Sequence, residues 1–201
     1  MVDVMKPETP EAPEPEPQEP LRGRTVLFIA LGVAAVLILL VVVFAQVKGG
    51  SPDTAATSLL DQPAPAVHTT TIDGAPFDLA QRKGSWVVLN FFGTWCPPCV
   101  QEHPELLRFA TSQAQQTDGA ELVTVVSNDD PAKVRQFFKD NGGTWPVLQD
   151  PNGEIYVAFG VSKVPETWIV DPNGYVRYRS IATVTADGLA ATLAQLKGQS
   201  P

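Results

Sequence analysis

Cysteine, histidine and basic side chains are scarce in this sequence. Two cysteines and two histidines occur among 201 residues, and the formal net charge is -8. A structural zinc ion takes a full set of cysteine and histidine ligands, so a zinc site of that kind is nearly excluded. Because no basic patch is present to neutralise phosphates, nucleic acid is not expected as a partner. No internal repeat is visible.

The first 24 residues repeat proline and glutamate. Proline removes backbone donors and neighbouring carboxylates repel one another, so this stretch cannot form a packed core. We predict that residues 1–24 are a disordered, solvated tail. A binding motif for a partner is the less favoured alternative.

Residues 25–47 contain no formally charged side chain and are mostly Leu, Val, Ile, Ala and Phe. As a helix they would extend about 35 Å, enough to cross the ~30 Å hydrocarbon core of a bilayer. A cleavable signal peptide has a shorter apolar region and ends in small residues, which Phe44-Ala45-Gln46-Val47 does not match. A buried core helix this apolar on all sides would lack a partner in so small a domain. We therefore predict an uncleaved transmembrane anchor.

The basic residues around this run predict its orientation. Arg22 and Arg24 precede it directly, whereas Lys48 alone follows it closely. Because lysine and arginine favour the cytoplasmic side, the amino terminus is predicted to be cytoplasmic. Residues 48–62 are then a flexible linker, and residues 63–201 form one folded domain outside the cytoplasm. The expected location is the cell membrane, with a single pass.

Strand and helix patterns alternate along residues 63–201. The predicted strands are residues 67–72, 86–92 and 122–127, the predicted helices are 98–116, 131–141 and a last one capped by Thr185, and residues 167–179 form an antiparallel hairpin. This order predicts an α/β domain with a mixed central sheet and helices on both faces.

The two cysteines lie together in Cys96-Pro97-Pro98-Cys99, directly after a predicted buried strand and at the start of a helix. A helix amino terminus offers unpaired N–H groups and a partial positive charge, both of which favour a thiolate. We predict that Cys96 is the exposed attacking sulfur and Cys99 the resolving sulfur. A static disulfide is one alternative, but so small a loop stabilises little. Half of a metal site is the other, and its remaining ligands are missing.

Two segments carry a resemblance to a known family. Residues 89–99, LNFFGTWCPPC, followed by Glu102 and His103, resemble the thioredoxin superfamily. Residues 164–171, VPETWIVD, are similar to the cis-proline strand of its TlpA, ResA and CcmG (DsbE) group of membrane-tethered proteins, and the NGYVRYR that follows looks most like the CcmG branch. The resemblance covers about residues 63–197. It implies a thioredoxin-like fold with an added amino-terminal β-hairpin.

The resemblance also implies how substrate is bound. Pro165 is expected to be cis and to lie beside Cys96, which leaves the backbone of Val164 free to pair with a substrate segment as an added strand. Trp95 is expected to shield the cysteines and contact substrate. No metal or separate cofactor is expected, because the redox-active disulfide is the reacting group.

Glu102 lies three positions after Cys99, on the same helical face. A carboxylate there is able to take the proton that Cys99 must lose before it attacks. An ordinary surface glutamate near a helix start is the alternative. The resemblance favours a functional role, because thioredoxins proper carry a buried aspartate where this chain has Asn90.

Other conspicuous side chains are predicted to be structural. His103 is expected to pack against the following turn rather than act as a base, and His68 is expected to be structural. Trp86, Trp145 and Trp168 are predicted core residues.

The resemblance implies that the protein reduces the Cys-x-x-Cys-His disulfides of apocytochrome c before haem attachment. Pro97 and Pro98 lack N–H groups, so a thiolate at Cys96 is expected to be weakly stabilised, which suits a reductant. Residues 25–47 contain no cysteine, so a separate transmembrane thiol reductase must supply the electrons. Two alternatives remain: a general extracytoplasmic disulfide reductase or oxidase, and a copper-binding assembly module using both cysteines and His103.

Overall fold

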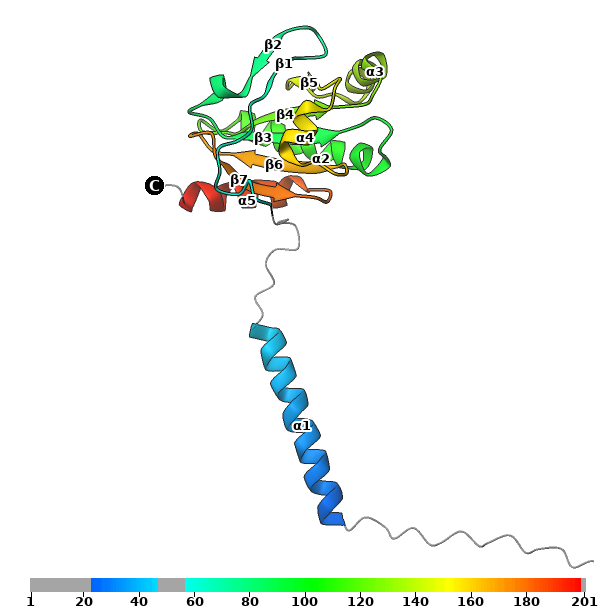
Figure 1. Cartoon of the computed structure of the whole chain (residues 1–201), viewed down its shortest axis with the longest axis vertical. Helices are drawn as coiled ribbons and strands as arrows, with labels where there is room; N and C mark the ends of the chain where they lie inside the picture. The colour runs from blue at the N-terminus through cyan, green and yellow to red at the C-terminus, as the bar shows by residue number, and fades with distance from the viewer. Residues whose placement is uncertain (1–22, 47–56, 200–201) are drawn as a thin grey trace, which may run out of the picture. The chain divides into compact units, whose positions relative to one another are not determined.

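The computed structural model describes residues 23–46 and 57–199, which fall into two units (Figure 1). Most of the predicted tail and the first part of the predicted linker lie outside the described residues. In the first unit, helix α1 spans Gly23–Gln46. Within the part of the chain that the structure describes, no helix has both the length and the apolarity that crossing a bilayer requires. The anchor at residues 25–47 therefore stays a prediction.

The second unit is built on a five-stranded mixed sheet with strand order β5-β4-β3-β6-β7. Strand β3 pairs in parallel with β4, and β4 with β5, whereas β6 runs antiparallel to both β3 and β7. The strands are β3 Val87–Phe92, β4 Glu121–Val126, β5 Val147–Gln149, β6 Glu166–Val170 and β7 Val176–Ser180. The predicted mixed sheet and the β6–β7 hairpin are confirmed.

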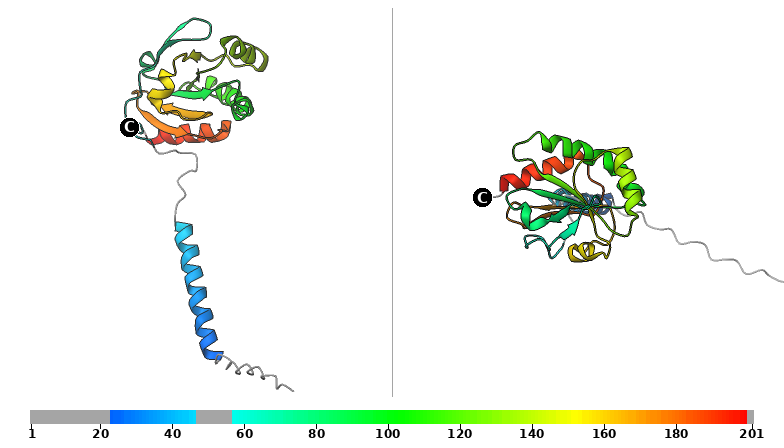
Figure 2. Two further views of the ribbon diagram at one scale, coloured as in Figure 1. Left: turned by 45° about the vertical axis from the view of Figure 1, so that its right-hand side comes forward. Right: turned by 90° about the horizontal axis from the view of Figure 1, so that it is seen from above.

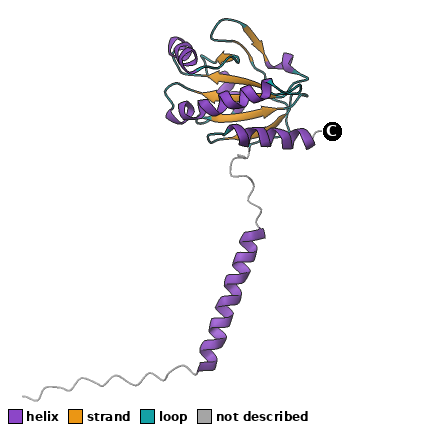
Figure 3. Cartoon of the chain, turned by 180° about the vertical axis from the view of Figure 1, so that it is seen from behind, coloured by secondary structure: helices purple, strands orange, loops and turns teal. Residues whose placement is uncertain are grey.

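Helices cover both faces of the sheet, as the sequence predicts. They are α2 Pro97–Ala114, α3 Pro131–Asn141, α4 Glu154–Phe159 and α5 Ala186–Gln199. Figure 2 shows α2, α3 and α5 over one face and α4 over the other, and Figure 3 shows the strands enclosed between them. Every residue of β3 is buried, because its alternate side chains enter the two opposite cores.

The expected amino-terminal hairpin is present as β1, His68–Thr70, paired antiparallel with β2, Pro76–Asp78. A short 3-10 helix, η1 (Leu79–Arg82), follows it. The hairpin region covers the β5 edge of the sheet, because the Gln149 side chain donates to the Thr71 carbonyl at 2.9 Å and the Ile72 N–H donates to the Val147 carbonyl at 2.8 Å. The edge that β5 would otherwise expose is thereby paired.

The folded domain begins earlier than predicted. Leu59 and Leu60, which the predicted linker included, pack against the hydrophobic core. The Asp61 N–H donates to the Val176 carbonyl at 2.9 Å, and the Asp61 carboxylate pairs with Arg177 at 2.7 Å. Two apolar side chains in a stretch of small residues were the sequence signal for this docking.

Of the three tryptophans predicted to be core residues, two are buried. Trp86 and Trp168 are buried, whereas Trp145 is half-buried and donates its indole N–H to the Thr124 hydroxyl at 2.9 Å. His68 lies on the exposed hairpin, with its imidazole 3.3 Å from the Asp78 carboxylate.

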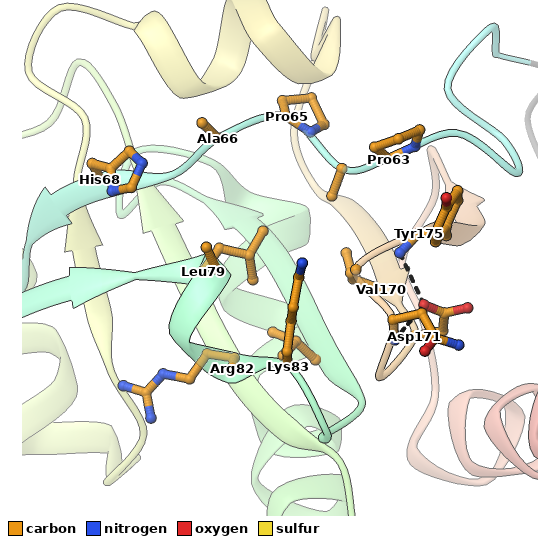
Figure 4. Close-up of a pocket in the computed structure, with 15 residues that line it drawn as sticks. Pro63, Pro65, Ala66, His68, Leu79, Arg82, Lys83, Val170, Asp171 and Tyr175 are labelled. Carbon is orange, nitrogen blue, oxygen red and sulfur yellow. Dashed lines mark hydrogen bonds between the residues drawn. The ribbon is translucent and has the colours of Figure 1, made fainter.

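A cavity of about 330 Å³ lies where the chain enters the domain. Figure 4 shows Lys83 extended along it, with Pro63 and Pro65 on one side and the Asp171 turn on another. Val87, the first residue of β3, also lines it. The cysteines follow the last residue of the same strand, so the cavity and the cysteines lie at opposite ends of β3.

Candidate active site

Helix α2 begins with its cap at Cys96, whose backbone is extended and whose sulfur accepts a hydrogen bond from the Cys99 N–H at 3.2 Å. Pro97 and Pro98 occupy the first helical positions, where a missing N–H costs no helical hydrogen bond. Cys96 and Cys99 are joined by a disulfide, with their Cα atoms 5.3 Å apart. The local sequence thus builds the helix start and sets the two sulfurs together.

The two sulfurs differ less in exposure than predicted. Cys96 is 4% exposed and Cys99 is 0% exposed, so Cys96 is the outer cysteine but is not openly exposed in the disulfide form. The Cys96 sulfur lies 3.6 Å from the carbonyl oxygen of Val164, which covers it. This loop, 68 residues further along the chain, was expected beside Cys96, but the sequence did not show that it would leave the sulfur so little exposed.

The peptide bond between Val164 and Pro165 is cis, as the resemblance implies. It directly precedes β6, the strand that pairs antiparallel with β3. That pairing brings the cis-proline loop to the end of β3 at which α2 begins. Val164 is half-buried and Pro165 is buried. The residues predicted to bind substrate therefore do lie beside the outer cysteine.

Trp95 is 57% exposed, next to the disulfide. Its indole folds back over Gly93: a Cβ atom on Gly93 would lie 2.8 Å from the ring, closer than such atoms approach. The residue between them, Thr94, donates its N–H to the Asp129 carboxylate at 2.6 Å and its hydroxyl at 2.8 Å. Asp129, in the loop after β4, was not predicted. Its sequence signal is a polar cluster that directly follows a buried parallel strand.

Glu102 is 3% exposed, so the alternative of an ordinary surface glutamate does not hold. One carboxylate oxygen accepts from the Asn90 side-chain amide at 2.8 Å, and the other accepts from the Val184 N–H at 2.9 Å. Burial raises the pKa of Glu102 from 4.5 to about 7, and the hydrogen bonds from Val184 and Asn90 partly oppose that rise. A carboxyl group with this pKa both gains and loses a proton readily near neutral pH.

His103 is buried among Phe92, Phe137, Phe138 and Trp145. Its Nε2 lies 2.9 Å from the Gly142 carbonyl oxygen, and burial lowers the pKa of the imidazole. The imidazole therefore packs, but against α3 and Trp145 and not against the following turn of its own helix, which was the predicted partner. Among the described residues, no three His, Cys, Asp or Glu side chains are grouped so as to hold a metal ion.

Glu166 follows the cis-proline and is completely buried, a role that the sequence analysis missed. Its carboxylate pairs with the Arg179 guanidinium at 2.8 Å and accepts from the Trp168 indole N–H at 3.0 Å. Arg179 also stacks over the Trp168 ring and donates to the Gly160 carbonyl at 3.2 Å. A glutamate at the start of a buried strand was the signal. Through Arg179, β7 is therefore tied to Glu166 after the cis-proline and to Gly160 before it.

These features define a class of protein. A dithiol pair at a helix amino terminus reacts by thiol–disulfide exchange. Here the pair forms the redox-active disulfide Cys96–Cys99 in a thioredoxin-like domain, with a cis-proline loop against the outer sulfur. The protein is a thiol-disulfide oxidoreductase.

The family follows from comparison with known proteins. Residues 59–196 match the family model described as Redoxin, and the chain belongs to this family. It is 32% identical over 154 residues to the thiol-disulfide oxidoreductase ResA of Bacillus subtilis, covering 75% of this chain and 82% of the relative. It is 30% identical over 182 residues to the thiol:disulfide interchange protein DsbE of Vibrio cholerae, covering 87% and 94%.

Comparison with a solved structure agrees with the similarity to DsbE. The chain is similar to a secreted Mycobacterium tuberculosis disulfide oxidoreductase described as homologous to DsbE of E. coli, with a TM-score of 0.58 and 26% identity. The match covers 64% of this chain and 95% of that one. The protein is therefore a thiol-disulfide oxidoreductase of the ResA and DsbE type.

Proposed function

We propose that the protein reduces Cys-x-x-Cys-His disulfides of apocytochrome c outside the cytoplasm, during cytochrome c maturation. The observation that carries the chemistry is the Cys96–Cys99 disulfide at the start of α2, with the Val164 carbonyl 3.6 Å from the outer sulfur. The choice of substrate is supported by the resemblance of the two motifs to the TlpA, ResA and CcmG group and by the similarity to ResA and DsbE.

The reaction begins when the Cys96 thiolate attacks one sulfur of the substrate disulfide, and the other substrate sulfur leaves as a thiolate. The Cys99 thiol then gives its proton to the Glu102 carboxylate, one helical turn further along α2. The Cys99 thiolate attacks the Cys96 sulfur, breaks the mixed disulfide and releases the second substrate thiolate. Two electrons pass to the substrate, and the protein is left with the Cys96–Cys99 disulfide.

The substrate segment lies along the cis-proline loop in this proposal. Val164 offers backbone groups for pairing with an extended peptide, as in other cases of strand addition. Trp95, exposed next to the disulfide, contacts the side chains that flank the substrate cysteines. Both contacts are made to the substrate chain around its disulfide and not to the reacting sulfurs. They therefore contribute to substrate specificity.

Residues 25–47 anchor the protein in the membrane in this proposal, with the catalytic domain outside the cytoplasm. That compartment is oxidising, so the disulfide must be reduced again after each turnover. The anchor contains no cysteine, and a transmembrane thiol reductase is therefore the electron donor. Tethering raises the effective concentration of the protein near that donor and near its substrate.

Trapping the intermediate tests the roles of the two cysteines. The Cys99→Ser variant should accumulate a mixed disulfide with a Cys-x-x-Cys-His peptide, because the resolving sulfur is missing. The Cys96→Ser variant should accumulate none, and it serves as the matched control. The opposite pattern would show that the two sulfurs have exchanged roles.

Substrate choice is tested by comparing two disulfides. The reduced protein should reduce the Cys-x-x-Cys-His peptide far faster than insulin. Equal rates would favour a general extracytoplasmic reductase. In cells, deletion of the protein should abolish covalently bound haem, and normal cytochrome c levels would contradict the proposed substrate.

A further inference from the structure

A buried polar cluster lies between the sheet and α2, and the reaction described above uses only one of its members. Asn90 of β3, Glu102 of α2 and Thr167 of β6 are all buried. The Asn90 Nδ2 donates to Glu102 Oε1 at 2.8 Å and to the Thr167 hydroxyl oxygen at 3.2 Å. The pairing of β3 with β6 places Asn90 directly opposite Thr167.

One atom of this cluster has no partner. The carbonyl oxygen of Asn90, Oδ1, is buried and forms no hydrogen bond. An unpaired buried acceptor destabilises the folded state and calls for an explanation. An ionised carboxylate only accepts hydrogen bonds, so the amide must present its N–H groups to it. A protonated carboxyl group carries an O–H that needs an acceptor.

Glu102 has no ionic partner among the residues that the structure describes. The titratable or charged groups of the elements packed on this face of the sheet are Cys99, His103, Glu105 and Arg108 on α2, Tyr178 on β7, Asp187 and Lys197 on α5, and Lys133, Arg135, Lys139 and Asp140 on α3. Lys197 pairs with Asp118, and Arg135 donates to the Ile72 carbonyl. Arg108 forms ion pairs with Glu105 and Asp187 at the surface, and the His103 imidazole contacts the Gly142 carbonyl. The buried Glu166–Arg179 pair lies on the opposite face of the sheet, with Trp168.

We propose that Asn90 is a positioning residue that serves Glu102 in both of its protonation states. When Glu102 is ionised, the amide donates to it, as the structure shows. When Glu102 takes the proton of Cys99, the amide turns over about its Cβ–Cγ bond and its carbonyl accepts the new O–H. The Thr167 hydroxyl follows the turn, because a hydroxyl accepts from the N–H in one state and donates to the carbonyl in the other. This inference rests on the proposed role of Glu102 in the reaction.

The test measures the pH dependence of the step that Cys99 carries out. Reduced full-length protein is mixed with an aromatic disulfide whose released thiolate absorbs visible light; the first release reports attack by Cys96 and the second reports attack by Cys99. Asn90→Leu removes, at similar volume, both the donor to the ionised carboxylate and the acceptor for the protonated carboxyl group, and the bond to the charged form is the stronger of the two. The pH midpoint of the second step should move by about one unit to the alkaline side, with the first step unchanged.

Two further variants isolate the effect. Thr124→Val removes a buried hydrogen bond on the neighbouring strand without touching Glu102, and it should leave the midpoint in place. In a Glu102→Gln background, Asn90→Leu should no longer move the pH profile. An unchanged midpoint in Asn90→Leu, or the same shift in both backgrounds, would overturn the proposal for Asn90 alone. If Glu102→Gln itself leaves the second step unchanged, the role of Glu102 fails and this inference with it.

Nuclear magnetic resonance on the wild-type protein tests the rotation of the Asn90 amide even if Asn90→Leu does not fold. The Asn90 side-chain amide signals should titrate with the same midpoint as the Glu102 carboxyl carbon. Amide signals that stay fixed while Glu102 titrates would refute the turn of the amide.

Discussion

Replacing Glu102 by glutamine should change how the stability of the domain depends on pH. The pKa of Glu102 is raised from 4.5 to about 7 by burial, so the folded protein holds this proton over a pH range in which the unfolded chain has lost it. Its stabilising effect is complete below pH 4.5 and is lost as the pH rises to about 7. The difference of about 2.5 units corresponds to about 3 kcal/mol at about 1.4 kcal/mol per unit.

The assay is urea unfolding of the oxidised protein at several pH values, followed by tryptophan fluorescence. The Gln side chain does not ionise, so the free energy of unfolding of Glu102→Gln, minus that of the wild type, should rise by about 3 kcal/mol between pH 4 and pH 8. Other titrating groups are common to both proteins and cancel in the difference. A difference that stays constant over this range would refute the reasoning, because it would mean that Glu102 is not desolvated by folding.

Two other substitutions test the surroundings of the disulfide. Gly93→Ala should displace the Trp95 indole, and the KM for the peptide disulfide should rise several-fold with kcat little changed. A wild-type KM would contradict the role of Trp95 in binding, and quenching of Trp95 fluorescence checks the displacement. Arg179→Met should leave the buried Glu166 carboxylate without its counter-charge and lower the free energy of unfolding by about 3–5 kcal/mol, measured by urea unfolding. Adding Glu166→Gln should restore most of that loss, and failure to do so would show that packing of the arginine matters more than its charge.

Much of the fold was predictable because its signals are local. The apolar run of β3, the Cys-Pro-Pro-Cys start of α2 and the Pro131 start of α3 each appear within a few consecutive residues. Strand β5 and helix α4 were missed, since three and six residues are too few to show a period. Both are instead held by distant contacts: Gln149 of β5 donates to the hairpin region, and the Tyr156 hydroxyl of α4 donates to the Phe92 carbonyl.

The sequence by itself determined the reacting pair and its place at the amino terminus of a helix, because the buried strand, the helix cap and the two prolines follow one another closely in the chain. The tertiary structure alone decided that Glu102 is buried against Asn90 and Val184, that Asp129 holds the turn before Cys96, and that Val164 covers its sulfur. The contacts of Asp129 and Val164 depend on the pairing of β3 with β4 and β6, and the contact of Glu102 with Val184 depends on where α2 lies against the segment before α5. A pattern of side chains along one chain carries no record of either arrangement.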